Sequence, residues 1–506
     1  MRKITIYITS LLLLIQGGSC SSDWFDINQN PNAAQSSTIQ LTLPAGIAGV
    51  AYVFGGKFQV LGGLWGQYWT QSPGAQQYRD LDQYKVSPGE FSRMWQIMYT
   101  GADRGSVNLQ GSGALKDLTA VQRMAREQEN WTYYLIATTM KVYGFQMMAD
   151  LYNDIPYTEA LKGLEVAAPI FDEGPLVYDS LINELDFALG QDLTIKDPTA
   201  ELGPEEVGTE DFVFAGDMDQ WVRFANTLKL KIYLRQVNAR PEVTQAGVQE
   251  LFSNGAEFLV EESAAMTQFN DAASQRNPLY ETEVTFLGNT SLIASNTSLQ
   301  YLLDNNDPRI DEFYELSRSD NAYIGLDQGT LFGDGNSDNY SRVDLGPVKP
   351  VYFMTVAEAY FLLAEAALRY PAAVGETPQV FYDAGVTASF ERLELLEDDM
   401  PPVQVADGGV YAYPTTGDFE TQLEAIITQK WVELNGIGGP EGFFEFNRTG
   451  YPSFFVESAN PFVNGIGFPQ RIPYDNEEAQ VNPNAPSYNE LEVRNGVWWS
   501  LKATGN

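Results

Sequence analysis

Apolar residues recur at three- and four-residue steps through several long stretches of the chain, the pattern of helices that bury one face. Helices of this kind follow one another in pairs, at a spacing of about 35 to 40 residues that resembles degenerate tetratricopeptide units. The pattern therefore predicts a mainly α fold built as a scaffold of helical hairpins. The strongest predicted helices lie at 117–151, 175–189, 217–235, 355–370, 381–390 and 418–434.

Capping residues mark where two of these helices begin. Asp217 is followed three positions later by Gln220, and Thr355 by Glu358, which is the spacing of a capping box. Asn435-Gly436 places a glycine where the last strong helix should end. Basic residues near the end of the 217–235 helix face the negative end of its dipole. They are Lys229, Lys231 and Arg235.

Two segments depart from the helical pattern. Between 45 and 99 the chain is dense in glycine and aromatic residues, so a regular helix is not expected through its middle, although 91–99 fits one. Residues 263–350 are rich in Asn, Asp, Ser, Gly and Tyr, with only short periodic pieces. A long irregular insertion in a helical protein is more often a binding region than filler. Short strands are expected only near 410–413 and 497–499.

The N-terminus has the pattern of an export signal. Arg2 and Lys3 precede an apolar run from Ile4 to Ile15, and small residues then lead to Cys20. The run is shorter than the roughly 20 residues that a membrane-spanning helix needs. Residues 1–20 therefore read as a signal peptide whose lipobox ends at a lipidated Cys20, with an ordinary signal peptide and an incidental cysteine as the alternative. Residues 21–44 would form an N-terminal leash.

Composition removes several classes of function. Lys and Arg number 30 against 67 Asp and Glu, so a formal charge of -37 makes nucleic acid a poor partner. The chain has no histidine, which excludes Ser-His-Asp and Cys-His catalysis and His-ligated zinc. Its single cysteine excludes an internal disulfide. No cofactor is implied.

One acidic loop has part of a calcium-binding pattern. Asp334, Asn336 and Asp338 alternate as oxygen ligands would, but the glycine at the sixth position and the glutamate at the twelfth are missing. A solvated loop is the preferred interpretation, and a calcium site is the alternative.

Several motifs together resemble the SusD/RagB-type nutrient-binding outer-membrane lipoproteins of Bacteroidetes. They occur in the family's order and cover nearly the whole mature chain. The matching stretches are 26–31, Ala149-Asp150-Leu151-Tyr152-Asn153-Asp154-Ile155-Pro156-Tyr157-Thr158-Glu159-Ala160, 216–230, 354–366, Ile427-Thr428-Gln429-Lys430-Trp431, 448–452, Arg471-Ile472-Pro473-Tyr474 and 482–484.

The resemblance implies one domain over 21–506, where length alone suggests about three. It also implies a helical scaffold, an irregular ligand-binding lobe, and a lipid anchor in the outer membrane on the cell surface. The partner it implies is a SusC-type TonB-dependent transporter, over which such a protein sits as a lid. The cargo would be an oligosaccharide, or a peptide in the closest alternative, and no catalysis is implied.

Candidate ligand contacts follow from composition and location. Aromatic planes can stack on sugar rings, while guanidinium and amide groups bond hydroxyls or carbonyls. The candidates are Trp65, Trp69 and Tyr78 in the glycine-rich segment, and Arg276, Asn277, Tyr280 and Tyr323 in the insertion. For each of them taken singly, packing in the core or between helices is the preferred interpretation.

Two other classes of protein stay open at this stage. A surface glycoside hydrolase needs two carboxylates about 5 to 10 Å apart across a cleft, and 67 acidic residues leave such a pair possible. A pure protein-interaction scaffold of tetratricopeptide type would bind no small ligand.

Overall fold

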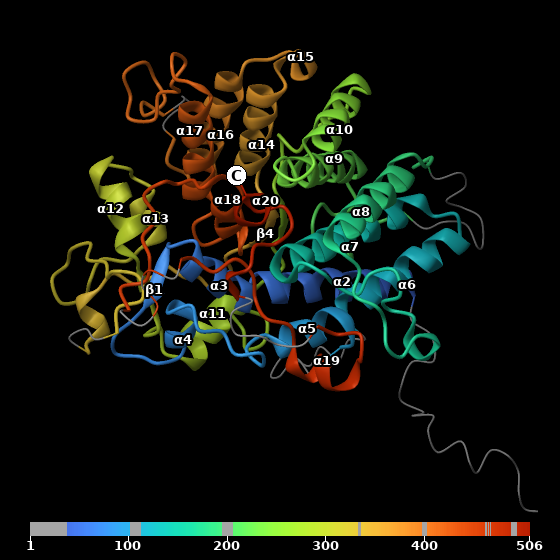
Figure 1. Cartoon of the computed structure of the whole chain (residues 1–506), viewed down its shortest axis with the longest axis horizontal. Helices are drawn as coiled ribbons and strands as arrows, with labels where there is room; N and C mark the ends of the chain where they lie inside the picture. Colours follow the sequence, from blue (N-terminus) through green and yellow to red (C-terminus); the bar gives the residue numbers. More distant parts are fainter. Residues whose placement is uncertain are drawn as a thin grey trace, which may run out of the picture.

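The predicted helices pair side by side in a computed structural model of the chain, as Figure 1 shows. The structure describes residues 38–101, 113–194, 206–331, 335–396, 402–460, 463, 465, 467–486 and 493–505. The signal peptide, Cys20, most of the leash and Asp334 lie outside these ranges. The prediction of a mainly α fold with few short strands is confirmed.

Two groups of helices form the hairpin scaffold. In Figure 1 the first group lies at the right and the second stands at the top of the molecule. The first group is α6 (Ala114–Glu127), α7 (Trp131–Tyr152), α8 (Gly174–Leu189), α9 (Met218–Arg235) and α10 (Pro241–Ser253). The second is α14 (Val356–Arg369), α15 (Pro371–Val374), α16 (Pro378–Arg392), α17 (Phe419–Glu433) and α18 (Glu441–Thr449).

The remaining elements, most of them short, surround this scaffold. At the N-terminal side they are α2 (Ile39–Phe54), α3 (Lys57–Trp65), β1 (Trp69–Gln71), α4 (Arg79–Asp82), α5 (Ser92–Tyr99) and the turn η2 (Gly163–Glu165). In the insertion they are β2 (Ala264–Met266), α11 (Pro278–Tyr280), the π-helical turn η3 (Glu281–Phe286), β3 (Leu292–Ala294), α12 (Asn296–Asp304), α13 (Ile310–Phe313), η4 (Ser337–Asn339) and β4 (Val351–Met354). Near the C-terminus they are α19 (Asn476–Val481) and α20 (Leu501–Thr504).

The two strand pairs fix the insertion to the rest of the protein. β2 and β4 pair antiparallel, with Ala264 opposite Met354, so the two ends of the 263–350 insertion meet. β1 pairs antiparallel with β3, with Trp69 opposite Ala294, which joins the insertion to the N-terminal segment. The insertion is therefore a closed lobe held at its base and at its centre.

The predicted caps are present, although neither capping box is complete. The Asp217 carboxylate accepts from the backbone N–H groups of Asp219 and Gln220, and the Thr355 hydroxyl accepts from that of Glu358. The side chains of Gln220 and Glu358 do not reach back. Gln220 donates to Glu261, and Glu358 takes part in a buried ion cluster.

Three expectations from the sequence need correction. The helix expected over 117–151 is two helices, because the chain reverses at 128–130, where Glu129 has a φ of 52°. No strand forms at 410–413 or 497–499, where Tyr411 and Trp499 are buried and bond to carboxylates. Tyr411 donates to Asp307, and Trp499 donates to Asp150.

The glycine-rich segment between 45 and 65 is helical, against expectation, and the last residues of the predicted leash already belong to α2. Its glycines permit close contacts. A Cβ at Gly62 would lie 1.7 Å from the Gly439 carbonyl oxygen, and one at Gly63 would lie 2.0 Å from the Trp69 ring. Among the described residues, Ile39–Trp65 is the one stretch long and apolar enough to span a membrane, but 61% of its most apolar 18-residue window is buried within the fold.

A cluster of ionic side chains lies at the centre of the scaffold. Arg235 on α9 bonds Glu445 at 2.9 Å, and Arg448 on α18 bonds both oxygens of Glu365 at 2.6 Å. Burial alone would raise the pKa of Glu445, but Arg448, Lys430 and Arg235 hold it well below its usual range. The ion cluster comprises Lys231, Arg235, Lys430, Arg448, Asp150, Glu358, Glu365, Glu441 and Glu445.

Removing one cation from this cluster should be costly. We expect Arg448→Met to lower the free energy of unfolding by about 3 to 5 kcal/mol, because Glu365 and Glu445 then stay buried without their main counter-ion. The control is Arg123→Met, which removes a pair with Glu127 whose side chains are 65% and 63% exposed and should cost less than about 1 kcal/mol. Urea unfolding measures both, and equal losses would contradict the assigned role of the cluster.

Candidate ligand-binding site

The three aromatic residues predicted from the glycine-rich segment lie in the core. Trp65 is 2% exposed and its indole N–H donates to the Leu81 carbonyl at 3.0 Å. Trp69 is 0% exposed within β1. Tyr78 donates to Glu283, and burial together with this carboxylate raises the pKa of the phenol. Protein covers these rings, so no sugar can stack on them unless the core opens.

The four candidates in the insertion lie nearer the surface. Arg276 bonds Asp271 at 2.6 Å and Glu281 at 3.3 Å, so its guanidinium already has two partners. Asn277 caps α11 and donates to the Lys349 carbonyl at 2.9 Å. Tyr280 and Tyr323 are partly exposed, and Tyr323 donates to Asp311. Asn277 is the only one of the seven that lines the cavity between the insertion and the scaffold.

The loop considered for calcium has other partners. Asn336 caps η4, and the Asp338 carboxylate bonds the Arg342 guanidinium at 2.6 Å. Among the described residues, no group of three or more metal-ligating side chains is close enough to hold an ion.

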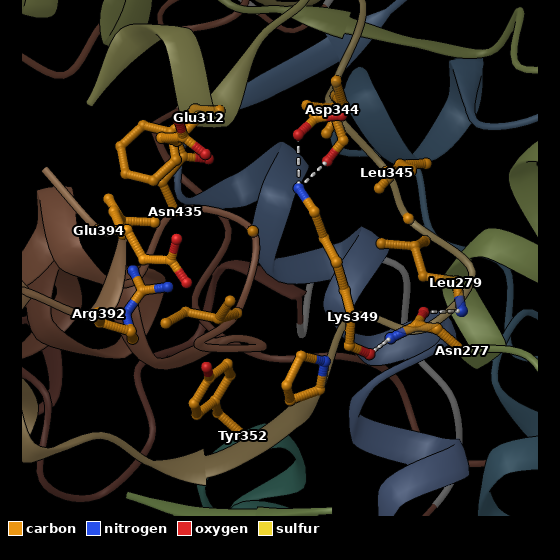
Figure 2. Close-up of a pocket in the computed structure, with 17 residues that line it drawn as sticks. Asn277, Leu279, Glu312, Asp344, Leu345, Lys349, Tyr352, Arg392, Glu394 and Asn435 are labelled. Carbon is orange, nitrogen blue, oxygen red and sulfur yellow. Dashed lines mark hydrogen bonds and ion pairs between the residues drawn. The ribbon is translucent and has the colours of Figure 1, made fainter. Parts of the chain in front are cut away.

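A cavity of about 520 Å³ opens between the insertion and the end of the second helix group, and Figure 2 shows the side chains around it. This volume lies within the range of small-ligand sites. Its walls come from segments that are far apart in the sequence. They are 277–279, 312–313, 343–350, Tyr352 on β4, 392–394 after α16, and 435–437 after α17.

Two cations on the cavity wall are held in place by acidic neighbours. Lys349 bonds the Asp344 carboxylate at 2.6 Å, as the dashed lines in Figure 2 show. Arg392 bonds Glu433 at 2.9 Å and lies 5.6 Å from the centre of the Tyr352 ring. Burial would lower the pKa of Arg392, but Glu433 raises it, so the guanidinium stays charged.

Two carboxylates on the same wall have no protein partner among the described residues. Glu312 and Glu394 both line the cavity, and within the described part of the chain neither side chain accepts a hydrogen bond or forms an ion pair. Figure 2 shows the carboxylate of Glu394 and that of Glu312 pointing toward the open space. They are therefore the strongest acceptors available to a ligand.

The cavity suits a ligand with many hydrogen-bonding groups. Hydroxyl groups can donate to Glu312 and Glu394 and accept from Lys349, while Tyr352 supplies a partly exposed ring. The location of the insertion pointed only indirectly to Glu312 and Lys349, and nothing in the sequence pointed to Tyr352 or Glu394. Glu394 and Lys349 belong to no motif, and only the closure of the lobe brings them together.

The fold and this cavity define a helical-hairpin binding protein, and comparison with known proteins supplies the family. The family model described as "Starch-binding associating with outer membrane" matches residues 32–475. The chain therefore belongs to the SusD-like family, as the sequence motifs indicate.

Solved structures share the fold. A SusD homologue from Bacteroides uniformis is 24% identical, with a TM-score of 0.73 and coverage of 91% of this chain and 99% of that one. A chitin-binding SusD homologue from Flavobacterium johnsoniae is 23% identical, with a TM-score of 0.65 and coverage of 90% and 98%. A SusD/RagB family protein from Bacteroides thetaiotaomicron is 19% identical, with a TM-score of 0.72 and coverage of 92% and 99%. No curated protein matches the chain.

The buried carboxylate of Asp82 should make the free energy of unfolding depend on pH. Asp82 accepts from Thr70 at 3.0 Å and from the backbone of Gly329 at 3.1 Å, and burial raises its pKa to about 7. The folded state thus holds a proton that the unfolded state has already released above about pH 4. The stability that Asp82 contributes is fully present below that pH and is lost as the pH rises to about 7.

Asp82→Asn should remove this dependence. We expect the free energy of unfolding of the wild type, relative to that of the variant, to fall by about 2 kcal/mol between pH 5 and pH 7. Urea unfolding at each pH measures the difference, and subtraction cancels the other titrating groups. Parallel curves for the two proteins would show that Asp82 is ionised in the folded state throughout this range.

Proposed function

We propose that the protein is a non-catalytic surface lipoprotein that binds a nutrient oligosaccharide and delivers it to a SusC-type TonB-dependent transporter. The observation that carries the binding role is the cavity between the insertion and the scaffold, where Glu312 and Glu394 are free to accept hydrogen bonds. Membership of a family described as starch-binding supports a carbohydrate as cargo. The chitin-binding homologue of the same fold supports it as well.

The outer-membrane location and the transporter rest on the family and on the N-terminal sequence. The family description includes association with the outer membrane. Arg2, the apolar run and Cys20 fit export and lipidation, and residues 21–37 would connect the lipid to the first described helix. A lid over a transporter needs such a connection, because the binding domain must move while its lipid stays in the membrane.

A binding function accounts for the cavity without catalysis. The cavity has two cations and several carboxylates on its wall, and these groups can orient a ligand by hydrogen bonds alone. A peptide could bond to the same groups, and the calorimetry described below distinguishes a peptide from an oligosaccharide. If the protein were a glycosidase, the purified protein would form shorter products from an oligosaccharide.

Calorimetry with neutral chitin and starch oligosaccharides tests the proposal. We expect saturable binding, and we expect Glu394→Gln to weaken it at least about tenfold, because a charge-assisted hydrogen bond contributes about 1.5 to 3 kcal/mol. The matched control is Glu127→Gln, a change at an exposed glutamate outside the cavity, which should leave the affinity unchanged.

Three results would count against this function. Binding of peptides with no affinity for any oligosaccharide would favour the peptide alternative. Release of shorter sugars during the titration would make the protein an enzyme. Equal affinities of wild type and Glu394→Gln would remove the cavity as the binding site.

A further inference from the structure

Three aromatic rings form a row that ends at the surface beside α12. Tyr411 and Tyr301 stack with centroids 6.3 Å apart and an interplanar angle of 11°. Tyr301 and Phe454 stack in turn at 5.1 Å and 19°. Tyr301 therefore has two stacked aromatic neighbours. Phe454 is 36% exposed, against 4% for Tyr411, so part of its ring surface is accessible to a ligand.

A second cavity, of about 390 Å³, opens at this row. It shares no lining residue with the cavity of Figure 2. Its wall combines two aromatic rings with amide, hydroxyl and carboxylate groups, and no basic residue is among them. The lining residues are Asn296, Thr297, Gln300, Tyr301, Asp304, Asp327, Phe454 and Val456.

One buried amide holds the two walls of this cavity together. Gln67 is 0% exposed, and its side chain bonds the backbone of Val456 twice, donating at 2.7 Å and accepting at 3.1 Å. The Thr297 hydroxyl on α12 donates to the same Gln67 oxygen at 2.8 Å. The segment that carries Phe454 is thereby fixed against α12 before any ligand arrives, which lowers the entropy cost of binding.

The polar groups of the cavity form two pairs that leave acceptors free. Asn296 donates to Asp327 at 2.7 Å, and Gln300 donates to Asp304 at 2.7 Å. Each pair uses one amide N–H and one carboxylate oxygen. Within the described part of the chain, the second oxygen of each carboxylate and the second N–H of each amide have no other partner, which matches the donor and acceptor pattern of adjacent hydroxyl groups.

We propose that this cavity is a second carbohydrate site, which takes an uncharged sugar unit stacked on Phe454 and bonded by Asp304 and Asp327. The aromatic plane binds the apolar face of the ring, and the carboxylates accept from its hydroxyl groups. The assignment rests on the proposed function and adds to it a class of cargo. With two carboxylates and no cation on its wall, the cavity repels uronate or sulfated sugars.

Calorimetry of the whole mature protein with a short neutral chitin oligosaccharide tests the second site. We expect two binding equivalents per chain for the wild type and one for Phe454→Ala. Because Phe454 also packs against Trp431, with centroids 5.4 Å apart, Asp304→Asn serves as a second variant that leaves the aromatic row intact. It should also lose one equivalent, or weaken it at least tenfold.

Two controls test whether the effect is specific to the second cavity and to neutral sugars. Phe286→Ala removes an aromatic ring that is 64% exposed and lies outside both cavities, so it should keep two equivalents. An anionic uronic-acid oligosaccharide of the same length should leave the second site empty. Thermal unfolding of each variant checks that the fold is retained.

The outcomes separate this proposal from the function on which it rests. If Glu394→Gln weakens binding while Phe454→Ala and Asp304→Asn both keep two equivalents, the second site is overturned and the proposed function stands. If the wild type binds no neutral oligosaccharide, both are overturned. A lysine-rich peptide that displaces the sugar at a lower concentration would reassign the cavity to cationic ligands.

Discussion

Charge compensation inside the scaffold is the constraint on which the rest of this structure depends. The ion cluster joins five helices through side chains that are almost fully buried, and none of its members can be left unpaired without a large penalty. Arg235 alone contacts Asp150 on α7 and two glutamates on α18. The positions of these helices are thus set by the geometry of ion pairs as well as by apolar packing.

Helix α17 carries this constraint to both proposed binding sites. Lys430 bonds Glu445 at 3.2 Å inside the cluster. Glu433, one turn later, holds Arg392 on the wall of the first cavity. Trp431 packs edge-on against Tyr301 and Phe454 and so supports the second cavity. Helix α17 therefore contacts the ion cluster, the cavity of Figure 2 and the three stacked rings. These contacts keep both sites in fixed positions relative to the scaffold.

The sequence predicted what depends on nearby residues. The caps at Asp217 and Thr355 and most helices of the scaffold follow from local spacing. The sequence places Lys231 and Arg235 near the end of a helix, and the structure shows both in the ion cluster. The sequence does not reveal this cluster, because a chain with a net charge of -37 has too many carboxylates to tell which ones are buried beside these cations. The burial of Trp65, Trp69 and Tyr78 is hidden from the sequence for a similar reason. Tyr and Trp are as suitable for a core as for a sugar, and only the close contacts at Gly63 show which role Trp69 has.

The site residues missed from the sequence share one property, which is that their neighbours are distant along the chain. Glu394 and Lys349 line one cavity only because β2 pairs with β4 and closes the insertion. Phe454 stacks directly on Tyr301 of α12, and the segment that carries it is held there by Gln67, which lies almost 400 positions earlier in the sequence. No local motif records such contacts, so the two cavities become visible only once the fold is known.

The most direct test of the central claim is a crystal structure of the protein with a neutral oligosaccharide bound. The account predicts sugar density in the cavity between the insertion and the scaffold, with hydroxyl groups within hydrogen-bond distance of the Glu394 carboxylate. An oligosaccharide bound elsewhere on the protein, with this cavity empty, would contradict it.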